Sequence, residues 1–234
     1  MILQRTIPLE NVSGRIDHMA VDVAGKRLFV AELGNGSVDV VDLQAGKAAH
    51  RIGGLKEPQG LAYITDWDLI VVANEGDGSV RFFRAADLSS LGTVNLGDDA
   101  DNVRIDPATR HVLVGYGDGG LAIIDAVTRS KIGGVALAGH PEGFQVDPKM
   151  NRAFVNVPDA HQIAVVDLGS GKQTSTWKVP GLGANFPMAL AGPTGPLAVV
   201  FRSPATLAIL DPTTGAGASR PCACTVRASG TIAA

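Results

Sequence analysis

The stretch Val38-Asp39-Val40-Val41-Asp42 recurs four times along this 234-residue chain. Similar runs, rich in apolar residues, end at positions 84, 125, 167 and 211, so successive copies lie 41 to 44 residues apart. A fixed period of this length is typical of an array of repeated supersecondary units. The repeat therefore decides the fold class, and it says much less about the chemistry.

Each repeat predicts four short strands separated by turns. In the second repeat the runs cover residues 60–64, 69–73, 79–83 and 93–96. They are rich in β-branched and aromatic residues and are bounded by Gly, Asp and Asn, a pattern that is typical of strands joined by hairpins. Four-stranded units of about 40–45 residues are the repeat of a β-propeller blade, and propellers typically carry about four to eight blades.

We therefore predict an all-β fold, a β-propeller of four-stranded blades with about five blades present. It is either a closed five-bladed ring or part of a seven-bladed one. The predicted order along the chain is an outer strand at 1–10, blades at about 14–54, 57–97, 99–139, 140–181 and 185–215, and an irregular tail at 216–234. The first strand would complete the last blade and protect two sheet edges. The tail lacks strand alternation, which suggests a truncated or frame-shifted end.

The composition indicates an ordinary globular protein, with 45% hydrophobic and 18% charged residues. A formal net charge of −3 gives no electrostatic reason to expect nucleic acid or anionic lipid as a partner. The two cysteines, Cys222 and Cys224, provide no disulfide framework, and the first residues lack a signal-peptide pattern. The uncharged stretch between Lys178 and Arg202 contains four prolines, so we predict turns and strands there and no membrane span.

The segment from Ala153 to Lys172, AFVNVPDAHQIAVVDLGSGK, resembles the YVTN-type β-propeller repeat, as does LFVAELGNGSVDVVD at 28–42. The resemblance covers roughly residues 3–215. It implies a seven-bladed propeller of the amine-dehydrogenase-like kind, usually bacterial and periplasmic or exported. This chain has five strand sets and no signal peptide, so its compartment stays open. A partial ring would expose apolar blade faces, and we expect it to self-associate through its blade edges.

Polar residues recur in the loops that enter the first strand of each blade and in those that join its second strand to its third. In a propeller these loops open on one face, around the central channel. The candidate ligand-binding residues are Asp17, His18, Gln59, Asp101, Asn102, His140, Glu142, Asn156, Asp159, His161 and Arg202. Carboxylates, amides and imidazoles can hold a divalent cation, and the candidate ligands are His18, Asp101, His140 and Glu142. The other interpretation is that these loops face water and hold no cofactor.

The sequence contains no nucleophile and base at a recognisable catalytic spacing. We therefore predict a non-catalytic binding or scaffold protein that engages a protein or a small ligand through its acidic loop face. One alternative is a metal-dependent hydrolase, which the resemblance to propeller lactonases implies. Another is a redox-associated propeller, by resemblance to amine dehydrogenases, for which the chain offers only Trp67 and Trp177 as quinone precursors.

Overall fold

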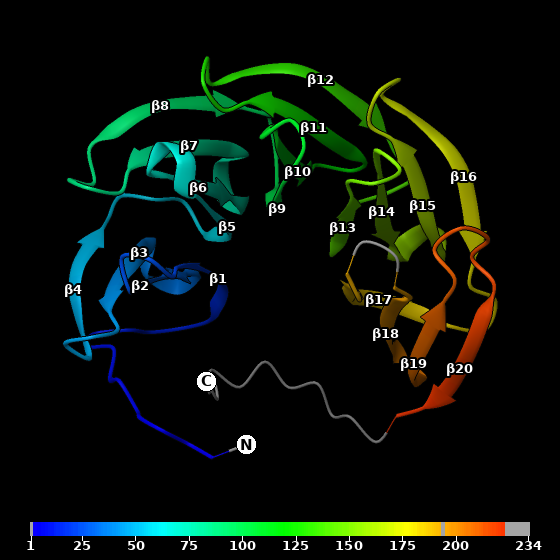
Figure 1. Ribbon diagram of the computed structural model, residues 1–234, viewed down its shortest axis with the longest axis horizontal. Helices are drawn as coiled ribbons and strands as arrows, with labels where there is room; N and C mark the ends of the chain where they lie inside the picture. Colours follow the sequence, from blue (N-terminus) through cyan, green and yellow to red (C-terminus); the bar gives the residue numbers. More distant parts are fainter. Residues whose placement is uncertain (1, 193–194, 223–234) are drawn as a thin grey trace. The chain divides into compact units, whose positions relative to one another are not determined.

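The computed structural model describes residues 2–192 and 195–222, which form twenty strands in five four-stranded antiparallel sheets (Figure 1). The first sheet comprises β1 (Ile16–Asp22), β2 (Arg27–Glu32), β3 (Ser37–Asp42) and β4 (Lys47–Ile52). The second comprises β5 (Pro58–Ile64), β6 (Leu69–Asn74), β7 (Ser79–Arg84) and β8 (Ser90–Asn95). The third comprises β9 (Ala100–Ile105), β10 (Val112–Tyr116), β11 (Gly120–Asp125) and β12 (Ser130–Ala136).

The remaining two sheets have the same sequential order. The fourth comprises β13 (Phe144–Asp147), β14 (Arg152–Val157), β15 (Gln162–Asp167) and β16 (Lys172–Lys178). The fifth comprises β17 (Gly183–Leu190), β18 (Leu197–Ser203), β19 (Ala205–Leu210) and β20 (Gly217–Pro221). Short 3-10 turns lie between some strands, at η1 (Leu33–Asn35), η2 (Thr65–Trp67), η3 (Glu75–Asp77) and η4 (Pro158–Ala160). These five sheets confirm the predicted four-stranded blades.

The chain divides into two compact units, one ending at Val103 and the next beginning at Arg104. The boundary falls inside β9. The first unit contains the first two sheets, and the second contains β10 to β20. In the described part of the chain no helix is long and apolar enough to cross a membrane.

The Asp residues that end the repeated stretch build the turn between the third and fourth strands. The Asp42 Oδ1 atom accepts hydrogen bonds from backbone N–H groups two and three residues later, each at 2.8 Å. Equivalent bonds recur at Asp125, Asp167 and Asp211. These backbone bonds hold the pKa of Asp42 below its usual value. The Asp that ends four of the five runs is therefore a turn-forming residue, because a short acceptor side chain can satisfy the N–H groups of its own turn.

A sheet that lies between two other sheets buries both of its faces, as β14 and β15 of the fourth sheet illustrate. Val155 and its neighbours pack against Leu113 and Leu121 of the third sheet. The alternate residue Phe154 packs with Val199 of the fifth sheet. In the first unit, the first and second sheets share a similar core, whose residues include Phe29, Val40, Ile70, Val72 and Phe83. Alternation of side chains along a strand therefore supplies both cores of one sheet.

The fifth sheet buries one face only. Ala208 of β19 belongs to the core, whereas its neighbours Leu207 and Ile209 are 37% and 41% exposed. This apolar face is where the expected self-association would take place, and that expectation stays a prediction.

Two predicted boundaries are wrong. Residues 217–221 form β20 rather than an irregular tail, and they pair with β19 with Ala218 opposite Ile209. All five residues of β20 are exposed, so backbone pairing holds this strand and no apolar alternation marks it. The rest of the predicted tail, 223–234, lies outside the described residues.

The second wrong boundary concerns the N-terminal segment. Residues 2–9 form no strand, although the sequence predicts one at 1–10 that completes the last blade. The fifth sheet already has its fourth strand in β20, so that position is filled. Arg5 instead donates to the carbonyl oxygens of the β3–β4 turn, at 2.9 Å to Ala45 and 3.4 Å to Leu43 and Gln44.

Candidate functional site

Five candidate residues lie in the first unit, at the strands that begin a sheet. Asp17 and His18 are in β1, Gln59 is in β5, and Asp101 and Asn102 are in β9. The turns from second to third strands lie at the same end of an antiparallel sheet as the start of its first strand. Residues of both loop types therefore lie at the same end of a sheet.

Arg15 connects the candidate residues of the first two sheets. Its Nη2 atom donates to Gln59 Oε1 at 2.9 Å and lies 2.8 Å from Asp17 Oδ2. His18 Nδ1 lies 3.1 Å from the other carboxylate oxygen of Asp17. Gln59 in turn donates through Nε2 to Glu75 Oε2 in η3. We call these five residues, His18, Asp17, Arg15, Gln59 and Glu75, the loop-end chain.

The loop-end chain carries two carboxyl groups whose pKa values are shifted in opposite directions. Burial alone would raise the pKa of Asp17, but the hydrogen bond and charge of His18, together with Arg15, outweigh it and lower this pKa. Burial, followed by the charges of Asp99 and Glu57, raises the pKa of Glu75. The surroundings of Glu75 are therefore acidic, and an added positive charge there is favourable.

Asp101 and Asn102 are both buried, and their side chains bond to each other. Asn102 Nδ2 donates to Asp101 Oδ2 at 2.9 Å. Of the first-unit candidates, Asp17, His18 and Gln59 are joined in one hydrogen-bonded series by Arg15, which was not among the predicted site residues. Arg15 precedes the first strand and has no counterpart in a recurring motif, so only the fold brings it to Gln59.

The second-unit candidates divide into internal and exposed residues. Asn156 is fully buried, donates to the Phe186 carbonyl at 3.0 Å and accepts from Asn185 Nδ2 at 2.9 Å. Asn156 therefore joins the fourth and fifth sheets, and these hydrogen bonds explain its buried amide without a ligand. The ring of Phe186 also stacks with the exposed Arg202, whose guanidinium carbon lies 4.2 Å from the ring centroid.

The other candidates of this unit lie in its loops. His140 Nδ1 lies 2.7 Å from the Gly117 carbonyl oxygen, and the Glu142 backbone N–H donates to the Asn156 carbonyl. Asp159 lies in η4, and His161 follows it in the left-handed conformation with φ 48°. Of the four candidate metal ligands, His18 and Asp101 belong to the first unit, and His140 and Glu142 to the second. The metal site stays a prediction.

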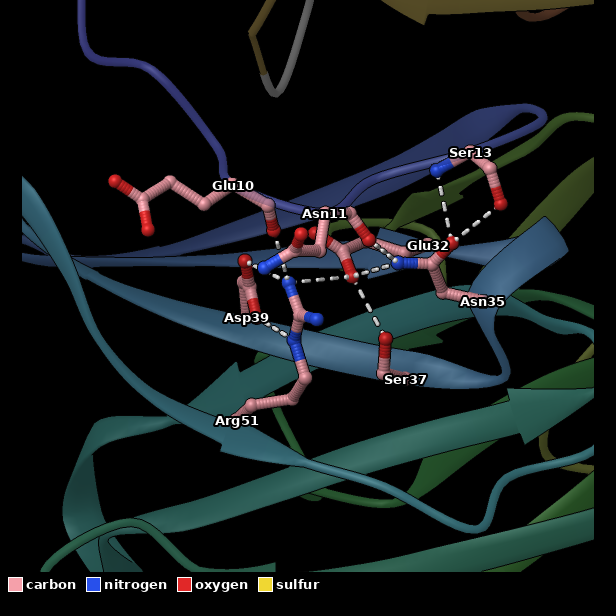
Figure 2. A network of polar contacts seen from close by, with 8 residues as sticks. All are labelled: Glu10, Asn11, Ser13, Glu32, Asn35, Ser37, Asp39 and Arg51. Carbon is pink, nitrogen blue, oxygen red and sulfur yellow. Dashed lines mark hydrogen bonds and ion pairs between the residues drawn. The ribbon is translucent and has the colours of Figure 1, made fainter.

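A second polar cluster in the first unit is built around a buried carboxyl pair (Figure 2). Glu32 ends β2, Asp39 lies in β3, and their exposures are 0% and 1%. Arg51 of β4 binds both oxygens of Asp39, at 2.5 Å from Nε and 2.9 Å from Nη2, and lies 3.4 Å from Glu32 Oε2. Ser37 Oγ donates to the same Glu32 oxygen at 2.7 Å.

This cluster also holds the N-terminal segment against the first sheet (Figure 2). Arg51 Nη2 donates to the Glu10 carbonyl at 3.0 Å, and Asn35 Nδ2 donates to the Asn11 carbonyl at 2.7 Å. Asn35 Oδ1 accepts from the backbone and the hydroxyl of Ser13, at 2.8 and 2.9 Å. The segment is thus tied by its backbone to side chains of the first sheet.

The two buried carboxyl groups have opposite pKa shifts. Burial, and then the hydrogen bond and charge of Asp39, raise the pKa of Glu32 against the opposing effects of Ser37 and Arg51. For Asp39, burial is outweighed by Arg51 and by the hydrogen bond with Glu32, and its pKa is lowered. Of the two carboxyl groups, Glu32 is therefore the one that gains a proton more readily.

Replacing Glu32 with Gln should make stability less dependent on pH. Because the folded-state pKa of Glu32 lies above its ordinary value of 4.5, the favourable contribution of this group is complete below that value. It is lost as pH rises through the raised folded-state pKa, at about 1.4 kcal/mol per pH unit at most. The amide of glutamine resembles the protonated acid and does not ionise. Urea unfolding at a series of pH values should therefore show a growing advantage of Glu32→Gln toward higher pH.

The matched control for this prediction is Glu10→Gln. The Glu10 side chain is exposed, and the bond that this residue makes to Arg51 uses its backbone oxygen. If both variants keep the pH slope of the unaltered protein, the raised pKa of Glu32 does not set the pH dependence of stability.

Comparison with known proteins identifies a similar fold but no family. No family model matches the chain, and no curated protein matches it in sequence. Its structure is similar to a chain of hydrazine synthase from Kuenenia stuttgartiensis, with a TM-score of 0.80 and 15% sequence identity. The match covers 92% of this chain and 69% of the other. Identity this low shows the fold alone. Together with the five four-stranded sheets, it establishes that this chain has the β-propeller fold.

Proposed function

We propose that this chain is a binding module that engages positively charged groups of a protein partner through the loop-end chain of its first unit. One observation carries the proposal. Side chains from the ends of two sheets form a continuous hydrogen-bonded series from His18 to Glu75, with Arg15 at its centre. Such mutual bonding holds side chains in place before a ligand arrives and reduces the entropy cost of binding.

The charge of this surface favours a cationic partner group. Asp17 and Glu75 belong to the loop-end chain, and Asp99 and Glu57 act on Glu75 through their charges. Arg15 already neutralises Asp17. Burial and the neighbouring acidic charges, by contrast, raise the pKa of Glu75. A Lys or Arg side chain of a partner would offset the repulsion between Glu75 and the neighbouring acidic groups. Basic peptides should therefore bind more tightly than neutral ones.

The test is a comparison of two double variants with the same change in net charge. Asp17→Asn with Glu75→Gln alters the loop-end chain, whereas Glu10→Gln with Asp118→Asn alters exposed acids elsewhere. An array of synthetic peptides with graded Lys and Arg content is probed with the labelled chain. We expect the unaltered protein and the control variant to retain basic peptides, and the loop-end variant to lose at least about tenfold in retained signal.

Equal retention by the two double variants would remove the loop-end chain as the binding surface. Preference for neutral or acidic peptides by the unaltered chain would contradict the charge argument itself. Thermal unfolding of both variants separates a loss of binding from a loss of folding.

A further inference from the structure

An open hollow lies in the second unit, where the fourth and fifth sheets present their loops. Its volume is about 730 Å³, within the range of about 300–1,000 Å³ that is typical of small-molecule sites. Apolar side chains supply part of its wall, among them Val179, Leu182 and Ala184. The turn that forms one side is closed by a hydrogen bond from the Leu182 N–H to the Val179 carbonyl at 3.1 Å.

The polar side chains around this hollow can all donate hydrogen bonds. Lys178, His161 and Ser203 contribute to its lining, and no carboxylate is found among the described residues that line it. The Lys178 ammonium donates to Gln162 Oε1 at 3.1 Å, which leaves two of its three donors. Within the described residues, the side chains of His161 and Ser203 make no hydrogen bond. The hollow therefore combines an apolar wall with unused donors, among them those of Lys178.

Two residues in its walls have a left-handed backbone conformation, which residues other than glycine seldom adopt. His161 and Ala184, both of which line the hollow, have φ values of 48° and 53°. Residues held in this region cost free energy and gather at ligand sites. The backbone also connects the two edges, because the Val179 N–H donates to the His161 carbonyl at 3.2 Å.

We propose that this hollow binds a small amphipathic carboxylic acid. The carboxylate is bound by the Lys178 ammonium, with His161 and Ser203 as further donors, and the apolar body lies against Val179, Leu182 and Ala184. Charge-assisted hydrogen bonds to a carboxylate are the strong ones, and the apolar wall offers a surface to the apolar body of the ligand. This site lies in the second unit and is independent of the loop-end chain in the first.

The experiment uses three probes that share one apolar body and differ in charge: phenylbutyrate, phenylbutanol and phenylbutylamine. Ligand-observed NMR and calorimetric titration of the full chain measure their affinities. We expect phenylbutyrate to bind most tightly, at least about tenfold above phenylbutanol, and phenylbutylamine to bind least. Lys178→Met should reduce phenylbutyrate affinity to that of the alcohol, while leaving phenylbutanol binding nearly unchanged.

The matched control is Lys172→Met, which removes an exposed lysine from the opposite end of the same strand. A further variant, Gly183→Val, fills the hollow, because a Cβ at Gly183 would lie 3.5 Å from the His161 ring. It should weaken all three probes, and its thermal unfolding shows whether it remains folded. If it does not fold, the comparison of the two lysine variants decides. Equal affinity for the acid and the amine, or equal losses in the two lysine variants, would overturn the proposal.

Discussion

Replacing Arg51 with Met should lower the free energy of unfolding by about 3 kcal/mol, although Arg51 itself is 37% exposed on its side chain. The loss comes from its partners. Asp39 stays buried as a carboxylate when the guanidinium is gone, and Glu32 beside it is fully buried. An uncompensated buried charge costs several kcal/mol, whereas an exposed ion pair contributes about 1 kcal/mol or less. The segment at Glu10 also loses its bond to Arg51.

Urea unfolding of three variants tests this explanation. Arg84→Met is the control, since Arg84 and its partner Asp87 are about half exposed, and it should cost at most about 1 kcal/mol. Adding Asp39→Asn to Arg51→Met should restore part of the lost stability, because the buried charge is then absent. An Arg51→Met variant as stable as Arg84→Met would show that the carboxyl pair does not depend on the guanidinium.

Replacing Phe154 with Ala should cost about 3–5 kcal/mol in the second unit. Phe154 is fully buried in the core that the fourth and fifth sheets share. Its ring lies 5.3 Å from that of Trp177, centroid to centroid, and the Arg152 guanidinium carbon lies 4.9 Å from its centroid. Truncation removes the contact with both groups and leaves a cavity between two sheets.

The measurement can use Trp177 fluorescence in a Trp67→Phe background, since these are the two tryptophans of the chain. Phe154→Leu should cost less, about 1.5 kcal/mol, because it conserves most of the volume. Ile132→Ala is the control, because Ile132 is more than half exposed and should change stability by about 0.5 kcal/mol at most. Equal costs for the Phe154 and Ile132 alanine variants would exclude a tight core at this position.

Most strands were predictable because side-chain alternation and turn residues, which define them, are local features of the sequence. The runs at 60–64, 69–73, 79–83 and 93–96 correspond to β5 to β8, since alternation and turn residues act within a few positions. The two errors lie where this local signal is absent. β20 is exposed along its whole length, and the segment at 2–9 has strand-like composition but no free position in the fifth sheet.

Site residues were predictable as loop positions but not as contacts. Asp17, His18 and Gln59 were predicted from their repeat phase, and Arg15 joins them through bonds that no spacing encodes. Asn156 had the same phase, yet its side chain bonds to Asn185 and the Phe186 carbonyl inside the unit. Phase places a residue at one end of a sheet, whereas packing of the neighbouring sheet decides whether it faces solvent.

The sequence by itself determined the repeat, the four-stranded sheets and the turns that Asp42 and its equivalents form. Those features depend on side-chain alternation and on hydrogen bonds within a few residues. Only the tertiary structure decided that the pKa values of Glu32 and Asp39 shift in opposite directions beside Arg51, and that Lys178 and His161 line one hollow. Burial and long-range proximity set the charge and the partners of a side chain, and neither is a property of the residue and its neighbours in sequence.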